Sequence, residues 1–197
     1  MHRLLFAFAL TLASCASTPS AQRPSEMRRE TSSKLDLYFG VRSLDGDDWA
    51  PVENQGTLGI EYVHESPGSA LGFELAFFAS GANKEDGVGT DERGGTGELS
   101  LGLHKTFGTG SDPVHPYIGG GVAAIHAEAK GVPGNESVKD DDGSAGVYVH
   151  GGILFDIGPT MLLGLDLRFL GGTDITLFGQ DASADYVQAA LVLGVGF

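Results

Sequence analysis

The stretch Tyr186–Phe197, YVQAALVLGVGF, carries the pattern that decides the fold. Apolar side chains recur at every second position from Val187 to Phe197, and small or polar residues such as Gln188 and Gly194 alternate with them. Successive side chains of an extended strand point to opposite faces of a sheet. The alternation therefore predicts a strand with one apolar face.

The same period of two recurs along most of the chain, whereas no segment has convincing helical periodicity. Each segment is about as long as the 9 to 11 residues with which a tilted strand crosses a membrane. The glycine-rich fifth segment has no clear assignment of faces. The eight predicted strands cover residues 34–42, 55–64, 70–79, 96–106, 116–127, 145–156, 160–170 and 186–197.

The connections between these segments alternate in length. Long polar stretches cover residues 43–54, 80–95, 128–144 and 171–183, and short turns lie around 67–68, 108–115 and 158–159. Short periplasmic turns opposite long extracellular loops are typical of outer-membrane barrels. We therefore predict an all-β fold: an eight-stranded antiparallel up-and-down transmembrane β-barrel over residues 34–197, with both of its ends on the periplasmic side.

Alternation alone does not say whether the apolar face points inward, as in a soluble barrel or sandwich, or outward to lipid. The other face carries glycine, serine and charged residues, which suit the narrow interior of an eight-stranded barrel. With this face inward, we expect a network of salt bridges in the lumen and no wide channel. The charged residues and histidines expected there are Asp36, Arg42, Glu61, Glu74, Glu98, His104, His150, Asp166 and Arg168.

One pair of these residues has the same charge. A two-residue turn at Pro67–Gly68 would place Glu61 and Glu74 directly opposite each other on neighbouring strands. Such a pair is unfavourable unless an arginine, protonation of one carboxyl group or a bound cation neutralises it.

The composition limits the possible partners. The formal net charge is −14 and only 12 residues are Lys or Arg, so a basic nucleic-acid groove is not expected. The sequence also has no combination of Cys and His that predicts a zinc site, and we expect neither a metal nor a cofactor.

The first residues predict targeting rather than structure. A basic start at His2 and Arg3 precedes an apolar region of ten residues, 4–13, which is too short for a membrane-spanning helix. The stretch Leu12-Ala13-Ser14-Cys15 resembles the bacterial lipobox. This resemblance implies a lipoprotein signal peptide over residues 1–14, acylation of Cys15, and a lipid-anchored flexible periplasmic tether over 15–33; a chance cysteine near an ordinary cleavage site is the alternative.

Two internal stretches carry a resemblance to a known family. HPYIGGGVAAIH at 115–126 and LLGLDLRF at 162–169 resemble strands of OmpA-like and OmpX-like outer-membrane barrels. The end of the sequence, with Val195 and Phe197, resembles the signal that the barrel-assembly machinery reads. The resemblance implies a monomer in the bacterial outer membrane, with a periplasmic N-terminus, that meets membrane lipid, lipopolysaccharide, and the barrel-assembly and lipoprotein-sorting machineries.

The resemblance leaves several functions open. The first is a structural or surface-interaction role, in which the barrel presents acidic extracellular loops that are expected to be solvated. The second is a small cation-preferring pore, and a third is a soluble lipocalin-like barrel that binds a ligand. The loop acids are Asp45, Asp47, Asp48, Glu53, Glu85, Asp86, Asp91, Glu92, Glu136, Asp140, Asp141, Asp142, Asp174 and Asp181.

A lipid A-modifying barrel enzyme is the remaining interpretation. Deacylase-type barrels use His, Ser and a carboxylate, and the local candidate His126-Ala127-Glu128 lacks the serine. Palmitoyl-transfer barrels need His, Asp and Ser together near the extracellular rim, and the fold would have to bring Ser80 or Ser183 there. No enzymatic activity is therefore expected.

Overall fold

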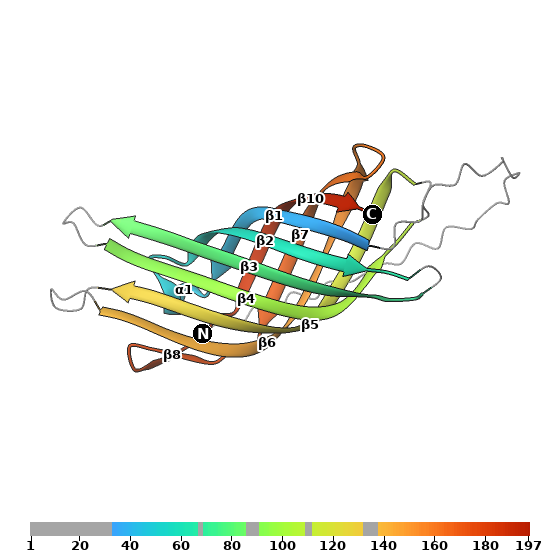
Figure 1. Ribbon diagram of the computed structural model, residues 1–197. Helices are drawn as coiled ribbons and strands as arrows, with labels where there is room; N and C mark the ends of the chain where they lie inside the picture. Colours follow the sequence, from blue (N-terminus) through green and yellow to red (C-terminus); the bar gives the residue numbers. More distant parts are fainter. Residues whose placement is uncertain (1–32, 67–68, 86–90, 109–111, 132–137) are drawn as a thin grey trace, which may run out of the picture.

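A computed structural model describes residues 33–66, 69–85, 91–108, 112–131 and 138–197 of the 197-residue chain (Figure 1). Eight antiparallel strands close into a barrel in the order β1-β10-β7-β6-β5-β4-β3-β2, which confirms the predicted fold. The barrel strands are β1 (Ser33–Leu44), β2 (Asn54–His64), β3 (Gly72–Glu85), β4 (Asp91–Thr106), β5 (Val114–Gly131), β6 (Val138–Asp156), β7 (Met161–Gly171) and β10 (Tyr186–Gly196).

The two faces of the barrel wall are sharply divided. Large apolar side chains such as Leu101, Leu165 and Leu191 point outward and are more than half exposed. Polar side chains on the alternating positions are buried inside, so the apolar faces point away from the interior, as the barrel interpretation required. In β5, whose faces were not assigned from the sequence, Tyr117 and Ile125 point inward and Ile118 and Val122 outward.

The barrel closes between the first and last strands. Leu37 pairs with Leu193 and Val41 with Ala189 in the middle of the β1–β10 ladder. At its end the backbone N–H of Phe197 donates to the carbonyl of Ser33 at 2.9 Å. Both ends of the described barrel therefore lie at the same rim, which is also the rim of the shorter connections (Figure 1).

Two of the predicted long loops are largely strand. β3 and β4 stay paired out to Glu85 and Asp91, and β5 and β6 stay paired out to Gly131 and Val138. The prediction of loops over 80–95 and 128–144 was wrong because the apolar alternation ends before the backbone hydrogen-bond ladder does. These two hairpins project beyond the other strands at the left of Figure 1.

The register between β2 and β3 also differs from the prediction. Glu74 pairs with Val63, and Glu61 pairs with Ala76, so the two glutamates are diagonal neighbours rather than directly opposite. The connection is longer than a two-residue turn, because β2 ends at His64 and β3 begins at Gly72, and within it the N–H of Ser69 donates to the carbonyl of Ser66 at 2.9 Å. Pro67 and Gly68, the predicted two-residue turn, lie outside the described residues.

An apolar layer fills the barrel at the rim of the longer connections. Short elements contribute to it: α1 (Gly46–Trp49) between β1 and β2, and the hairpin of β8 (Ile175–Leu177) and β9 (Gln180–Ala182) between β7 and β10. Trp49 is 2% exposed, and its indole N–H donates to the carbonyl of Ser183 at 2.7 Å. Among the described residues, no helix is long and apolar enough to cross a membrane. The buried members of the layer are Leu44, Trp49, Val52, Ala123, Ile125, Ala127, Tyr148, Leu170, Ile175, Leu177, Ala184 and Tyr186.

Two of the acidic residues expected to be merely solvated bind the β8–β9 hairpin to β6. The N–H of Thr176 donates to Asp142 at 2.7 Å, and the N–H of Phe178 donates to Asp140 at 2.6 Å. The two carboxylates thereby accept hydrogen bonds from backbone N–H groups along the edge of the hairpin. The backbone hydrogen bonds from Thr176 and then Gly143 lower the pKa of Asp142.

We expect Asp142→Ala to loosen the hairpin at neutral pH and to raise the hydrogen-exchange rate of the Thr176 amide, after correction for the intrinsic rate. In the unaltered protein the lowered pKa means that the contact contributes fully above the ordinary aspartate value of about 3.9 and is lost as the pH falls through the lowered value. Asp141→Ala is the matched control, because Asp141 contacts His126 on the outside instead. Equal protection in both variants would contradict this assignment.

Candidate functional site

The barrel interior holds the polar residues that the sequence placed there. Each of them is at most 4% exposed, and all but Asp36 and Asp166 form two clusters along the barrel. They are Asp36, Arg42, Glu61, Glu74, Glu98, His104, His150, Asp166 and Arg168.

The first cluster, called the arginine cluster, consists of Arg42, Arg168 and Glu98. One guanidinium nitrogen of Arg42 lies 3.1 Å from Glu98 Oε2, and one of Arg168 lies 2.7 Å from Glu98 Oε1. Each oxygen of a single buried carboxylate is thus used by a different arginine. Tyr186 also donates its hydroxyl to Glu98.

Neutral groups complete the surroundings of the two guanidinium groups. Arg42 donates to the side-chain carbonyl of Gln188 at 2.9 and 3.0 Å and to the hydroxyl of Thr96 at 2.8 Å. Arg168 donates to Ser100 at 2.8 Å and lies over the ring of Tyr148 at 3.8 Å. Stacking on aromatic faces helps to hold buried guanidinium groups.

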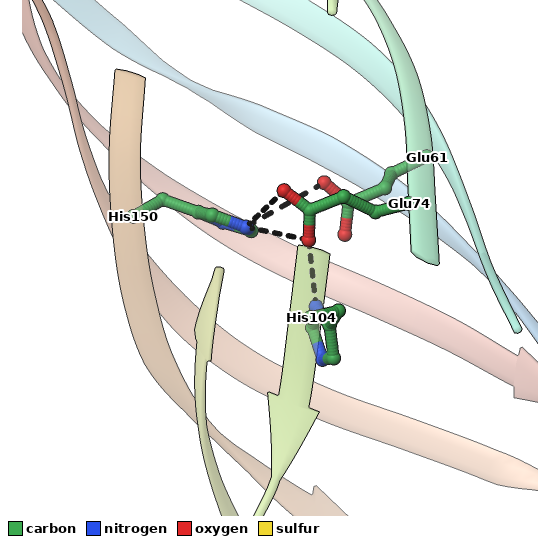
Figure 2. Close-up of side chains that lie close together, drawn as sticks. All are labelled: Glu61, Glu74, His104 and His150. Carbon is green, nitrogen blue, oxygen red and sulfur yellow. Dashed lines mark hydrogen bonds and ion pairs between the residues drawn. The ribbon is translucent and has the colours of Figure 1, made fainter. Parts of the chain in front are cut away.

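The second cluster, called the histidine–carboxylate cluster, consists of Glu61, Glu74, His104 and His150 (Figure 2). Glu74 Oε2 lies 2.8 Å from His104 Nδ1 and 3.0 Å from His150 Nε2. Glu61 Oε2 lies 4.0 Å from the same nitrogen of His150. One potential ligand atom from each of the four residues lies within 4.8 Å of the others.

Tyrosines and a further carboxylate orient this cluster. Tyr148 donates its hydroxyl to Glu74 Oε1 at 2.7 Å, and Tyr38 donates to Glu61 Oε1 at 2.9 Å. Asp166 lies 3.0 Å from Nδ1 of His150. Each glutamate therefore has one oxygen hydrogen-bonded to a tyrosine, while its second oxygen faces the histidines.

Gly119 leaves the space in which the cluster assembles. It pairs with His104 on β4 and with His150 on β6, so it lies between the two histidines in the sheet. A Cβ atom at this position would collide with His150 Nε2 and Glu74 Oε2. Only a residue without a side chain lets the glutamate from β3 reach both histidines.

Negative charge exceeds positive charge around the histidine–carboxylate cluster. Asp36 and Asp166 are buried beside Glu61 and Glu74, and Lys34 lies 3.2 Å from Asp36. The arginine cluster has the opposite balance, with two guanidinium groups and one carboxylate. The barrel interior is therefore divided into an electropositive and an electronegative layer.

The sequence placed most of these residues on the inner face but did not bring them together. The proximity of His104 and His150 depends on the register of three strands around Gly119, which the glycine-rich pattern of β5 concealed. The inward tyrosines were not considered as hydrogen-bond donors, although Tyr38, Tyr148 and Tyr186 occupy the inner parity of their strands. Lys34 has that parity as well and was not counted among the interior charges.

The residues considered for lipid A chemistry are not arranged as a catalytic site. His126 points outward and is exposed, whereas Ser80 hydrogen-bonds to Gln55 and Thr96 inside the barrel. Ser183 contacts Trp49 and Asp48 through its backbone. His126 and Ser80 thus lie on opposite faces of the barrel wall.

The residues predicted for targeting are only partly described. Val195 is 44% exposed on the outer face of β10, and Phe197 is 67% exposed directly after it. Cys15, like all of the predicted signal peptide and most of the tether, lies outside the described residues.

Glu98→Ala should destabilise the barrel by about 3–5 kcal/mol, because it leaves two buried guanidinium groups without a counter-charge. The free energy of unfolding in urea, measured with the protein in detergent micelles, tests this. Glu128→Ala is the control: it also removes an acid from a 2.8 Å ion pair, with Lys139, but that pair is on the surface and should contribute little. Equal losses for the two variants would refute the importance of the arginine cluster.

No protein-family model matches the chain, and no curated protein is similar enough in sequence to be called a relative. Solved structures do match it. Neisserial surface protein A of Neisseria is 16% identical with a TM-score of 0.52, and the match covers 84% of this chain and 96% of that one. The attachment invasion locus protein of Yersinia pestis, in complex with the heparin analogue sucrose octasulfate, is 15% identical with a TM-score of 0.54 over 83% and 95%.

A major outer membrane protein of Thermus thermophilus is 13% identical with a TM-score of 0.53, over 84% of this chain and 99% of that one. Likeness at this level of identity concerns the fold. The chain accordingly has the closed eight-stranded β-barrel fold found in outer-membrane proteins.

Proposed function

We propose that this protein spans the bacterial outer membrane as a closed barrel and holds an acidic surface outside the cell. The observation that carries the proposal is the inverted distribution of polarity. Leu165 and Leu101 are each 57% exposed, whereas Arg42, Arg168 and Glu61 are fully buried. A monomer in water rarely exposes a continuous apolar band of this kind, so the band fits a lipid surrounding.

The dimensions of the wall support the same conclusion. β1, β2, β7 and β10 have 11 or 12 residues, against the 9 to 11 that a tilted strand needs to cross the hydrocarbon core. The longer strands β3 to β6 exceed this length through polar hairpins, which would stand clear of the bilayer.

The proposed orientation has the rim of Ser33 and Phe197 in the periplasm. This rim has the shorter connections, which in outer-membrane barrels face the periplasm. It would place the proposed tether and an acylated Cys15 on the side where the lipoprotein-sorting and barrel-assembly machineries work. The barrel would then lie in the membrane as a monomer surrounded by lipid and lipopolysaccharide.

The role that we propose at the outer rim is interaction with cationic partners. The β3–β4 and β5–β6 hairpins continue as paired strands, which makes them rigid supports, and Asp140 and Asp142 hold the β8–β9 hairpin against β6. Exposed acids such as Asp141 and Glu128 are presented on this frame. The attachment invasion locus protein of Yersinia pestis, which shares the fold, is named for attachment and invasion.

A diffusion pore is less well supported by the interior. The apolar layer around Trp49 lies across the barrel near the outer rim, and the arginine cluster follows beneath it. A water-filled path would have to pass both layers, and an eight-stranded barrel leaves little room beyond its own side chains.

The membrane-spanning proposal is tested with the full mature chain carrying Cys15→Ala, which lacks the proposed lipid. We expect it to require detergent for solubility and to change its gel mobility on boiling. Leu165→Arg should then lower the free energy of unfolding in lipid vesicles by about 2–4 kcal/mol, as arginine does near the bilayer midplane.

The control for this substitution is Ile157→Arg. Ile157 is 53% exposed, like Leu165, but it lies in the connection between β6 and β7 at the rim. Its replacement should cost about 0–1 kcal/mol, the value near the membrane interface. A Cys15→Ala chain that is monomeric and soluble in buffer, with equal effects of the two arginines, would support a lipocalin-like barrel instead.

Deletion of Phe197 should lower the yield of assembled barrel in cells without a matching loss of stability once the protein is folded. The reason is that Phe197 is 67% exposed and its described hydrogen bond is a single backbone contact with Ser33. Yield is measured in outer-membrane fractions, and stability by urea unfolding of the purified variant. An unchanged yield would argue against an assembly signal at Val195 and Phe197.

A further inference from the structure

We propose that Glu61, Glu74, His104 and His150 bind one divalent transition-metal ion of the zinc type inside the barrel. The proposal concerns the interior alone and is independent of the membrane and of the outer surface. It goes beyond the proposed acidic surface and differs from the expectation from the sequence that no metal is bound.

Three of the donor-atom separations are near the value that such a site requires, and all of them are within 4.8 Å. Zn²⁺ binds imidazole nitrogen and carboxylate oxygen at about 2.0–2.2 Å, so neighbouring ligand atoms of a tetrahedral site lie about 3.3 Å apart. Around Glu74 Oε2 the separations are 2.8 Å to His104 and 3.0 Å to His150, and His150 lies 4.0 Å from Glu61. These values lie on both sides of the required one, so modest side-chain shifts would complete the geometry.

The orientation of Glu61 points to a missing cation. Its Oε1 accepts the hydroxyl of Tyr38, whereas its Oε2 is buried and has no hydrogen-bond partner. A buried carboxylate oxygen without a partner is costly. A metal ion between this oxygen and His150 would satisfy it without displacing Tyr38.

The surroundings of His150 fit a metal ligand. Both of its ring nitrogens face carboxylates: Nδ1 faces Asp166, and Nε2 faces Glu74. Without a metal, both nitrogens must carry a proton to donate these bonds. With a metal at Nε2, the Nδ1–H still donates to Asp166, which is the carboxylate–histidine–metal arrangement that orients such ligands.

The charge of the layer supports a divalent ion. Lys34 balances one of the four carboxylates Asp36, Glu61, Glu74 and Asp166, so three negative charges remain while the histidines are neutral. One divalent cation reduces this excess as much as protonation of both histidines would. The two possibilities differ in whether a metal is retained, and this can be measured.

The ligand types select the class of ion. Ca²⁺ prefers six to eight oxygen ligands, and Mg²⁺ binds mostly through carboxylates and retained waters. Two imidazoles with two carboxylates suit zinc and its neighbours in the first transition row, among which geometry and availability decide.

The experiment uses the full chain, folded into detergent micelles either with Zn²⁺ or with EDTA, because a fully buried site must fill during folding. After gel filtration, elemental analysis should find one zinc ion per chain in the first sample. The zinc-folded protein should also unfold at a higher temperature. Folding with Co²⁺ should give the intense visible absorption of tetrahedral cobalt, which reports the coordination directly.

The variants separate ligands from other residues. Glu61→Gln, His104→Gln and His150→Gln should each reduce zinc retention at least tenfold. Asp166→Asn should weaken zinc binding about 10- to 100-fold, as expected for a positioning residue. His126→Gln is the matched control, since it removes an exposed histidine from the outer face and should leave one zinc per chain.

Wild-type protein without stoichiometric zinc, or with a cobalt spectrum lacking tetrahedral bands, would overturn the proposal in favour of protonated histidines. Equal retention in the ligand variants and in His126→Gln would place the zinc elsewhere. If a ligand variant does not fold, the wild-type stoichiometry and cobalt spectrum still decide the question.

Discussion

The width of an eight-stranded barrel is the constraint on which the rest of the structure depends. The interior has room for side chains and little else, so every inward residue must fit the shape and charge of those opposite. Large inward groups are matched by glycines on neighbouring strands. Gly59 makes room for Phe78, Gly102 for the hydroxyl of Tyr148, and Gly119 for the meeting of His150 with Glu74. Much of the high glycine content is therefore a consequence of packing polar and aromatic groups into a narrow tube.

The same constraint explains why the interior charges are sorted into layers. Arg42 and Arg168 share Glu98 and stack on tyrosines, so their positive charge is held within one layer. The carboxylates gather in another layer, where histidines and tyrosine hydroxyls surround them. Removing one member would leave an uncompensated buried charge, which costs more than the pair itself contributes. The network thus specifies one arrangement of the wall.

The architecture could be predicted from the sequence because period-two alternation reports the two surroundings of a barrel wall directly. Leu163, Leu165 and Leu167 alternate with Gly164 and Asp166, and each took the expected side. The predicted loops over 80–95 and 128–144 failed for the same reason. The apolar alternation stops where the side chains no longer face an apolar surrounding. The backbone hydrogen-bond ladders of β3–β4 and β5–β6 continue through polar residues beyond that point.

The sequence alone was sufficient to establish most of the strand pattern and which side chains share a face, since both follow from parity within a strand. That the apolar face points outward and the charged face inward was a prediction from the narrow interior of such a barrel, and the closed barrel confirmed it. The tertiary structure decided which of those charges meet. Glu61 and Glu74 became diagonal neighbours because the connection between β2 and β3 shifts the register by two residues. Gly119 lies between His104 and His150 in the closed sheet, and because it has no side chain, Glu74 can reach both histidines. Register and closure relate distant strands, and no local pattern within one strand contains that information.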